Sequence, residues 1–453
     1  MSFLVYQRDY LHNFIIKSSD KMFLSLRKGV SLVSEVAFPE IRRRFSRTSV
    51  AWANESLTNR NDSLSNNPST NSNNAAPSSQ TTAKKHRGLS TSHFIHPAVA
   101  PIAITGTAAS KEESREFMAV FPDIVRDLTD AGRYTDASDA NKWFSKVLQY
   151  NVPGGKKNRG LALVFAFKML TRSDQHTPEN IRLAHVLGWC VEMLQAFFLV
   201  SDDMMDNSET RRGRPCWYKK DDVGMAAMND CILLEAGIYQ LLHKYFRDKP
   251  YYVEILELFH DVTLKTSMGQ SLDLLSCPQG QKPKLDLFTM KRYNTIVKYK
   301  TAYYSFQLPV ALAMYMAGMR DPETHRQAKT ILLEMGHFFQ VQDDYLDCFG
   351  DNKLTGKKGT DIEDGKCTWL AVVALQRASQ EQRALMQECY GSKKPEDIDR
   401  VKYLYEELGL PHTYATYEEE SFNLISTHIQ QISRGLPHDL FFKFMDKIYR
   451  RES

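Results

Sequence analysis

The sequence contains no long hydrophobic run. Its longest largely apolar stretch, from Leu308 to Met319, ends after twelve residues. A helix that spans a lipid bilayer needs about 18 or more apolar residues in succession. We therefore expect no transmembrane segment, and the sequence argues against an integral membrane protein.

Cysteine is also scarce, with seven residues in a chain of 453. All seven follow residue 110, no two of them form a Cys-x-x-Cys pair, and their number is odd. Disulfide frameworks and structural zinc sites use paired cysteines at short, regular spacings. The pattern therefore favours free thiols in a reducing compartment.

Acidic residues are rare in the first 110 positions, which hold 13 Lys and Arg against 6 Asp and Glu. Because the whole chain carries a formal charge of +4, residues 111–453 carry −3. Residues 1–53 interleave apolar side chains with arginines and serines, a composition typical of mitochondrial transit peptides. The alternative is a basic tail with no targeting role. No aromatic or Gly-Arg repeat accompanies the charge, so we do not expect nucleic-acid binding.

Residues 54–110 are predicted to be a disordered linker. Asn, Ser, Thr, Ala and Pro dominate its first part, most clearly from Asn66 to Asn74. Such low-complexity sequence buries too little apolar surface to offset the entropy lost on ordering.

From residue 111 to 453 the sequence predicts a single all-α domain. Apolar residues recur at intervals of three and four, β-type alternation is scarce, and no glycine-rich loop after a strand or Walker pattern is present. Proline and glycine clusters divide this part into about a dozen helical pieces. Two long pieces, 185–206 and 285–319, are apolar on most faces, which suits central helices of a large bundle.

Two aspartate-rich segments carry the chemistry, Asp-Asp-x-x-Asp at 202–206 and again at 343–347. Residues four apart share one face of a helix, so the first and last Asp of each segment point the same way. Both segments also have Phe-Phe five and four residues before the first Asp and Val two residues before it. This match indicates an internal duplication.

Six acidic residues at apolar helix ends require a compensating cation. Two like charges about 4 Å apart repel by about 4 kcal/mol at an effective dielectric constant near 20. Hard carboxylate oxygens suit Mg²⁺, which is commonly bound by one or two carboxylates and by phosphates of the substrate. The two segments therefore predict a magnesium site rather than two solvated helix ends.

Basic residues lie close to both aspartate segments. Arg211-Arg212-Gly213 follows the first and Lys357-Lys358-Gly359 follows the second, and Gly154-Gly155-Lys156-Lys157-Asn158-Arg159 opens a further helix. Helix N-termini with glycine-exposed amides favour anions, and Lys156 and Arg159 are close enough in sequence to serve one phosphate. Acidic residues for metals beside basic residues for phosphates predict a diphosphate substrate.

With these motifs, residues from about 111 to 451 resemble the trans-prenyltransferases of the polyprenyl synthetase family. Lys300-Thr301, Gln340-Val341-Gln342 before the second aspartate segment, and Thr360-Asp361 complete the similarity. The resemblance implies an isoprenoid-synthase-type bundle of about ten or more helices around a deep central cavity. It also implies Mg²⁺-dependent, head-to-tail condensation of isopentenyl diphosphate with dimethylallyl diphosphate and then geranyl diphosphate, which gives a fifteen-carbon product.

The resemblance also implies a role for each matching residue. Three Mg²⁺ ions, which Mn²⁺ can replace, are expected at Asp202, Asp206 and Asp343, with Asp203, Asp344 and Asp347 in supporting positions. The allylic diphosphate is expected at Arg211, Lys300, Thr301, Gln340, Lys357 and Lys366, and isopentenyl diphosphate at Lys156, Arg159, Gln195 and Arg212. Lys300, Thr301 and Gln340 would stabilise the carbocation, and no side-chain base is needed because diphosphate removes the proton. Tyr449-Arg450-Arg451 matches a basic tail that closes over isopentenyl diphosphate.

The helix geometry and the resemblance together bear on product length. Phe197 and Phe198 precede Asp202 by about one turn, hence about 6 Å deeper in the cavity. In the family, aromatic residues at these two positions form a floor that stops growth at fifteen carbons, and the resemblance implies the same role here. The alternative is that the two rings are ordinary core packing. The alternatives are a ten- or twenty-carbon (geranyl or geranylgeranyl) synthase and a non-catalytic prenyl-diphosphate-binding subunit. A terpene cyclase is disfavoured, because cyclases usually carry a different second motif.

The resemblance further implies a homodimer that pairs through helical faces. We expect a cytoplasmic protein, with a mitochondrial form if residues 1–53 act as a transit peptide.

Overall fold

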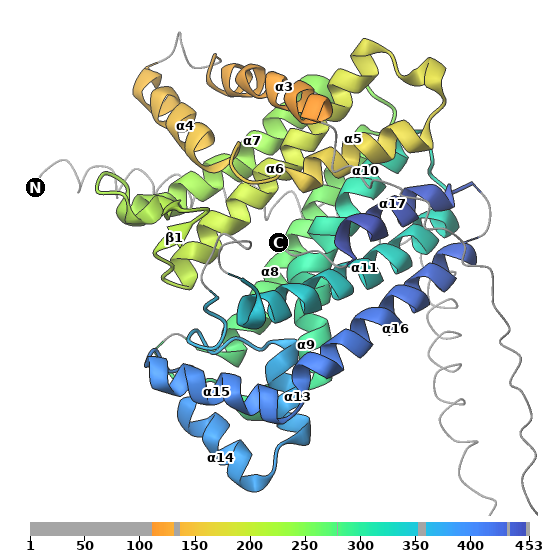
Figure 1. Cartoon of the computed structure of the whole chain (residues 1–453). Coiled ribbons are helices and arrows are strands. Elements are labelled where there is room, and N and C mark those ends of the chain that lie inside the picture. Colours follow the sequence, from red (N-terminus) through yellow and green to blue (C-terminus); the bar gives the residue numbers. More distant parts are fainter. Residues whose placement is uncertain (1–110, 131–135, 279, 352–358, 433–434, 450–453) are drawn as a thin grey trace, which may run out of the picture. The chain divides into compact units, whose positions relative to one another are not determined.

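The computed structural model describes residues 111–130, 136–278, 280–351, 359–432 and 435–449 (Figure 1). All of them belong to the unit Ala100–Ser453. The basic segment 1–53, the linker 54–110, Lys357 and the tail residues Arg450 and Arg451 lie outside the described residues. What the sequence predicts for them stays a prediction.

The described residues are almost entirely helical, which confirms the predicted all-α class (Figure 1). The α-helices are α3 (Lys111–Thr129), α4 (Ser138–Asn151), α5 (Asn158–Leu170), α6 (Pro178–Met205), α7 (Ala227–Phe246), α8 (Tyr252–Ser276), α9 (Met290–Ile296), α10 (Leu308–Met316), α11 (Pro322–Phe349), α13 (Trp369–Arg377), α14 (Gln380–Cys389), α15 (Pro395–Glu407), α16 (Leu410–Gln430) and α17 (His438–Ile448). Within the described ranges the only strands are the two-residue pair β1 (Thr210–Arg211) and β2 (Arg214–Pro215).

The two helices that carry the aspartate segments begin in the same way. The side chain of Thr177 accepts a hydrogen bond from the Asn180 amide before α6, and that of Asp321 accepts one from the Thr324 amide before α11. Each helix then has proline in its first turn and is 28 residues long. Such caps satisfy amides that the first turn leaves unpaired, and their repetition agrees with the predicted duplication.

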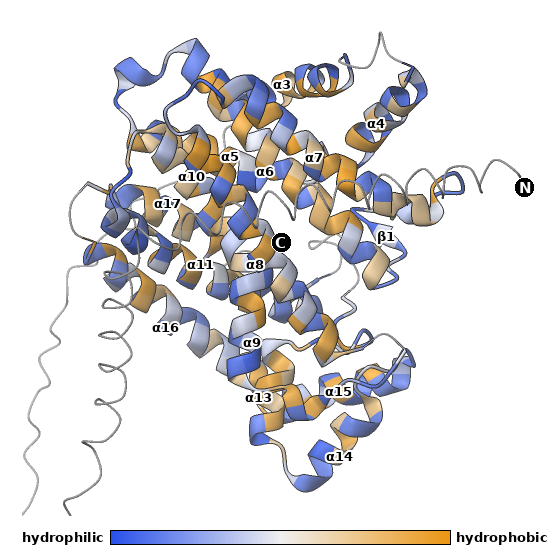
Figure 2. Cartoon of the chain, turned by 180° about the vertical axis from the view of Figure 1, so that it is seen from behind, coloured by the Kyte–Doolittle hydropathy of each residue, from blue (hydrophilic) through white to orange (hydrophobic). Residues whose placement is uncertain are grey.

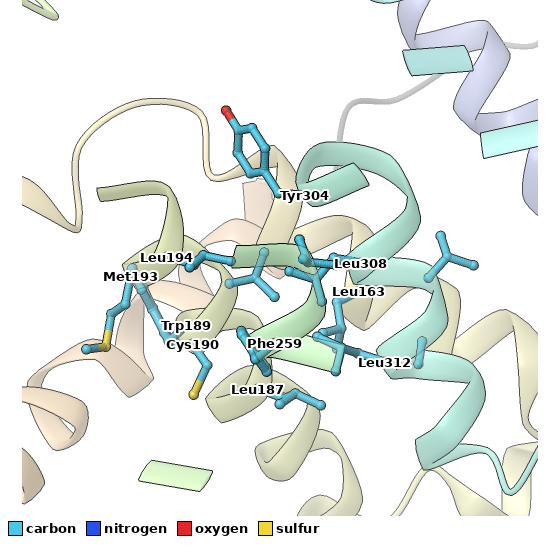
Figure 3. Close-up of a cluster of buried hydrophobic side chains, with 14 of the residues drawn as sticks. Leu163, Leu187, Trp189, Cys190, Met193, Leu194, Phe259, Tyr304, Leu308 and Leu312 are labelled. Carbon is cyan, nitrogen blue, oxygen red and sulfur yellow. The ribbon is translucent and has the colours of Figure 1, made fainter. Parts of the chain in front are cut away.

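Helix α6 lies at the centre of the larger hydrophobic core, between α5 and α7. Figure 3 shows its side chains Leu187, Trp189 and Leu194 among Leu163 of α5, Phe259 of α8 and the leucines of α10. By length and composition α6 is able to cross a membrane, but 83% of its most apolar window is buried. That environment is the one expected of a core helix.

The apolar stretch 285–319 contains the predicted long helical piece, which runs without a break from Met290 to Met316, but its geometry changes along its length. After α9 the chain widens into a π-helix, η6 (Val297–Gln307), and returns to α geometry in α10. Pro309 has no amide hydrogen, and in an α-helix its ring would clash with the carbonyl group of Ser305. A continuous α-helix is therefore disfavoured here, and π segments frequently mark functional sites.

A second hydrophobic cluster joins α9, α13, α14 and α15. Its largest buried side chains include Tyr293, Tyr390 and Tyr405. Figure 2 shows that α15 and α16 mix hydrophilic and hydrophobic residues along their length, as helices with one buried face do. The cluster includes Ile362 and Cys367, which belong to the segment that follows the second aspartate motif.

Candidate active site

The two aspartate segments meet at the π-helix η6. Lys300 of η6 lies 3.3 Å from Asp202 at the end of α6, and its neighbour Thr301 donates a hydrogen bond of 3.1 Å to Gln340 of α11. Asp206 caps α6 and accepts a hydrogen bond from Lys366, which follows the second segment in the chain. The structure therefore brings together residues from both halves of the predicted duplication.

A buried carboxylate that the sequence analysis missed links the lysines. Asp273 of α8 is 6% exposed and lies 2.6 Å from Lys300 Nζ and 3.4 Å from Lys366 Nζ. Burial alone would raise the pKa of Asp273, but the two ammonium groups outweigh it and lower the pKa to about 2. Aspartates and lysines thus alternate across the site, from Asp202 through Asp273 to Asp206.

The middle aspartate of each segment has a different environment from the outer ones. Asp203 is buried and accepts a hydrogen bond of 2.9 Å from Arg211 Nε. Asp344 is buried as well and accepts hydrogen bonds from Gln340 Nε2 at 3.0 Å and from the Trp369 amide at 2.8 Å. Burial raises the pKa of Asp344 to about 7. These two side chains hold neighbouring groups in position.

The outer aspartates of the second segment, Asp343 and Asp347, are partly exposed. Asp347 Oδ2 accepts a hydrogen bond of 2.9 Å from the Asp361 amide, which ties the helix to the loop that follows. Burial alone would raise the pKa of the Asp202 carboxyl group, but the positive charges of Lys300, Lys366 and Arg211 outweigh this effect and lower the pKa. Asp202 is therefore charged at neutral pH.

Three residues in or near the basic segments have unusual backbone conformations. Lys157, Asn207 and Arg212 are the non-glycine residues with positive φ among those described. Arg212 (φ 56°) and Gly213 (φ 72°) form the two-residue turn between β1 and β2, and a type I′ hairpin turn requires positive φ at both positions. A positive φ costs energy in a residue other than glycine, and residues held in this conformation cluster at functional sites.

The residues predicted to bind isopentenyl diphosphate have different environments. Arg159 donates hydrogen bonds to Ser305 Oγ at 2.8 Å and Tyr304 OH at 3.2 Å, both on η6. Gln195 is 8% exposed, and its side-chain oxygen has no hydrogen-bond partner among the described residues. Lys156 and Arg212 are exposed. An unpaired buried amide oxygen is uncommon in native proteins and is expected where a ligand completes the contacts.

A cavity of about 330 Å³ reaches from Asp202 to the predicted floor. Asp202, Lys300 and Thr301 line it together with Phe197 and Phe198. The two phenylalanine rings are 4.9 Å apart, and the ring of Phe198 lies 5.5 Å from that of Tyr304. One cavity therefore connects charged groups to an aromatic wall.

Two glycines that the sequence analysis did not single out allow η6 to approach its neighbours. A Cβ atom on Gly269 of α8 would lie 2.2 Å from the Lys300 amide nitrogen, and one on Gly336 of α11 would lie 2.5 Å from Ala302 Cβ. Any larger residue at either position would move η6. Each is the only glycine in its helix, and its role is visible only from the packing of the helices.

The carboxylates fit magnesium by their chemistry. Asp202, Asp206, Asp343 and Asp347 offer only hard oxygen donors, which Mg²⁺ prefers. Within the described part of the chain, no group of three or more acidic, histidine or cysteine side chains is gathered closely enough to hold a metal by itself. Lys300 and Lys366 instead contact Asp202 and Asp206. This arrangement suits an ion that shares its ligands with a substrate diphosphate.

A comparison with known protein families matches residues 141–408 to the polyprenyl synthetases. The chain belongs to the polyprenyl synthetase family. Farnesyl pyrophosphate synthase of Murgantia histrionica is 55% identical over 354 residues, which cover 78% of this chain and 86% of that protein. The Gallus gallus farnesyl pyrophosphate synthase is 52% identical, over 76% of this chain and 93% of that protein.

A solved structure shares the same fold. The T. brucei farnesyl diphosphate synthase complexed with risedronate has a TM-score of 0.69 and 34% sequence identity, and the match covers 75% of this chain and 100% of that chain. Polyprenyl synthetases are typically Mg²⁺-dependent. The family resemblance predicted from the motifs is thereby confirmed.

Proposed function

We propose that this chain is a farnesyl diphosphate synthase, which condenses isopentenyl diphosphate with dimethylallyl diphosphate and then with geranyl diphosphate. The observation that carries the proposal is one cavity lined both by Asp202 and Lys300 and by the rings of Phe197 and Phe198. A diphosphate anchored at the charged end would direct its prenyl tail toward the rings. The animal relatives named above support the same activity.

The metal ions are assigned to Asp202, Asp206 and Asp343. We expect three Mg²⁺ ions, replaceable by Mn²⁺, with Asp347 supporting the site. When bound, Mg²⁺ would neutralise charge that develops on the departing diphosphate. Asp203 and Asp344 act indirectly, because their carboxylates already accept hydrogen bonds from Arg211 and from Gln340.

Cationic side chains bind the allylic diphosphate. Arg211, Lys300 and Lys366 converge on the first aspartate segment, and Lys357 is predicted to join them from outside the described residues. Lys300 and Lys366 are held by Asp273, so their ammonium groups stay near the leaving group. Positive charge placed in advance at such a point lowers the barrier to ionisation.

Ionisation leaves an allylic carbocation, which oxygen dipoles stabilise. The Thr301 hydroxyl donates its hydrogen to Gln340 Oε1, so its lone pairs can face the cavity that Thr301 lines. The double bond of isopentenyl diphosphate attacks the cation, and the released diphosphate takes the proton. The proposed reaction therefore uses no side-chain base.

Isopentenyl diphosphate is assigned to Lys156, Arg159, Gln195 and Arg212. The segments that carry Lys156 and Arg212 meet where Arg212 lies against Gly154 and Gly155. Arg159 also stacks on the ring of Tyr304 at 4.7 Å, which places this guanidinium between the basic loop and the cavity wall. Arg450 and Arg451 are predicted to close over the same substrate.

A homodimer is proposed through α7 and α8. Seven large hydrophobic side chains are exposed on this pair of helices or immediately before them: Met225, Met228, Ile232, Val253, Leu264, Met268 and Leu275. The opposite side of α8 supplies Gln270 and Asp273 to the site. We propose that a second copy of the chain covers this exposed face. Sedimentation equilibrium of the full chain tests the proposal, because a monomer at micromolar concentration would contradict it.

The cellular location is proposed to be cytoplasmic, with a mitochondrial form directed by residues 1–53. Fluorescent fusions of the full chain and of a version that begins at residue 54 test this proposal. Mitochondrial signal that disappears with the first 53 residues supports a transit peptide, and identical distributions contradict it.

The activity is tested with radiolabelled isopentenyl diphosphate and dimethylallyl diphosphate in the presence of Mg²⁺. We expect a fifteen-carbon product after dephosphorylation and no product with EDTA. A twenty-carbon product would retain the chemistry but contradict the proposed floor, and a ten-carbon product would indicate a geranyl synthase. Absence of incorporation by folded protein would favour a non-catalytic binding subunit.

A further inference from the structure

A buried carboxylate outside the cavity joins two tryptophans. Asp230, in the first turn of α7, is 1% exposed. Its Oδ1 accepts a hydrogen bond from Trp143 Nε1 and its Oδ2 accepts one from Trp217 Nε1, both at 2.8 Å. Burying a carboxylate is costly unless its oxygens are satisfied, and here each oxygen has one indole. We call Trp143, Asp230 and Trp217 the Trp–Asp clamp.

The two tryptophans lie close in sequence to the two basic segments. Trp143 is on α4, which ends at Asn151, just before the loop that contains Gly154, Gly155 and Lys156. Trp217 follows the β1–β2 hairpin, which contains Arg211 and Arg212. The clamp therefore joins two segments that are about sixty residues apart in the chain.

Tyr150 reinforces this connection. Its ring lies 5.0 Å from that of Trp217, and its hydroxyl donates a hydrogen bond of 2.7 Å to the carbonyl oxygen of Pro215 in β2. The Arg214 guanidinium lies 4.0 Å over the same ring. The last turn of α4 is thus packed directly against the hairpin.

The two joined segments meet at Arg212. A Cβ atom on Gly154 would lie 2.7 Å from Arg212 Nη1, and one on Gly155 would lie 2.8 Å from Arg212 Nε. The guanidinium therefore lies directly against the two glycines that precede Lys156. A small displacement between hairpin and loop would therefore move Arg212 away from Gly154 and Gly155.

We propose that the Trp–Asp clamp positions the isopentenyl diphosphate site by holding the Arg212 hairpin against the Gly154–Arg159 loop. The inference rests on the proposed function, which assigns that substrate to Lys156, Arg159 and Arg212. Arg211 is fixed separately by its hydrogen bond to Asp203 of α6. The clamp therefore affects binding of isopentenyl diphosphate and leaves binding of the allylic substrate largely unchanged.

The decisive variant is Trp217→Phe in the full chain. It keeps an aromatic ring but removes the indole N–H, so one oxygen of Asp230 loses its partner. We expect the KM for isopentenyl diphosphate to rise about tenfold, with the KM for geranyl diphosphate changed by less than about twofold. Steady-state kinetics with each substrate varied in turn measure this split.

Trp189→Phe is the matched control. Trp189 is fully buried, and its Nε1 donates a hydrogen bond of 2.9 Å to the Phe117 carbonyl oxygen, so the same chemical change occurs outside the clamp. We expect a comparable fall in Tm and no change in either KM. Equal KM values for isopentenyl diphosphate in Trp217→Phe and wild type would overturn the inference, as would equal rises for both substrates.

Two further measurements keep the test decisive. If Trp217→Phe does not fold, Tyr150→Phe removes only the hydroxyl that contacts Pro215, and it is expected to raise the same KM by a smaller factor. An unchanged KM in that variant then contradicts the clamp.

If the wild type does not condense the substrates, the proposed function fails instead. Calorimetric titration of isopentenyl diphosphate into wild type and Trp217→Phe then tests the clamp alone.

Discussion

Gln340 and Asp344 are joined within one turn of α11 by a hydrogen bond of 3.0 Å, from Gln340 Nε2 to Asp344 Oδ1. This contact fixes the orientation of the Gln340 amide. With the NH₂ group held by Asp344, the amide oxygen is left to accept the hydrogen of Thr301. The middle aspartate of the second segment thus orients two oxygen dipoles without lining the cavity itself.

Replacing Asp344 with Asn is therefore expected to lower kcat more than it raises either KM. An Asn side chain can present an NH₂ group to Gln340, and the fixed orientation of the Gln340 amide is then lost. We expect a fall in kcat of about 10- to 100-fold, measured by single-turnover kinetics beside thermal unfolding. A normal single-turnover rate would contradict the orienting role.

Replacing Asp202 with Asn tests the metal assignment. The substitution keeps the shape of the side chain but removes the charge that lies between Lys300 and Arg211. We expect a loss of turnover of about a thousandfold, with far-UV circular dichroism and Tm close to wild type. EDTA treatment of the wild type should abolish turnover and added Mg²⁺ should restore it. Normal turnover of the variant would remove Asp202 from the metal site.

Shortening Phe198 tests the floor of the cavity. Its ring lies between those of Phe197 and Tyr304, so Phe198→Ala opens space along the cavity wall. We expect products longer than fifteen carbons, identified by chromatography after dephosphorylation. Tyr304→Phe is the matched control, because it keeps the ring and should leave product length unchanged. An unaltered fifteen-carbon product from Phe198→Ala would contradict the assignment.

Gly269→Ala tests the close approach of α8 to η6. The new Cβ would lie 2.2 Å from a backbone nitrogen, so the two helices must separate. Such overpacking typically costs about 1–3 kcal/mol or more, and displacement of Lys300 should also reduce activity. Gly237→Ala is the control, because there the nearest atom is the terminal methyl group of Met193, at 3.0 Å. Denaturant unfolding and kcat of both variants distinguish the two sites.

His337 predicts how stability depends on pH. Burial lowers its pKa to about 4, and the ring contacts Tyr417 and Asn294. In the unfolded chain the ring titrates near its ordinary value of about 6.5, so between these values the unfolded state binds more protons. The stabilisation is complete above pH 6.5 and is lost as pH falls toward 4. Urea unfolding at about pH 5 and pH 7.5 should show a smaller pH effect in His337→Gln than in wild type.

Much of the fold follows from local pattern alone. Helical periodicity predicts the all-α class, and the caps at Thr177 and Asp321 agree with the starts of the two motif helices. The i to i+4 spacing places Asp202 and Asp206 on one face, because spacing along a helix depends only on residues within a turn or two. The helical piece predicted within 285–319 is present from Met290 to Met316, but the π geometry of Val297–Gln307 was not predicted, because the apolar pattern of this stretch marks a helix without fixing its hydrogen-bond geometry.

The sequence by itself determined the helical class, the paired aspartate segments and the diphosphate chemistry that their neighbours imply. Only the tertiary structure decided the partners of Asp273, the glycine contacts of η6 and the Trp–Asp clamp. Asp273 is a lone acidic residue in α8, and nothing within a few positions marks it. Its role depends on Lys300 and Lys366, which are 27 and 93 residues away. Contacts of that range are set by how whole helices pack against one another.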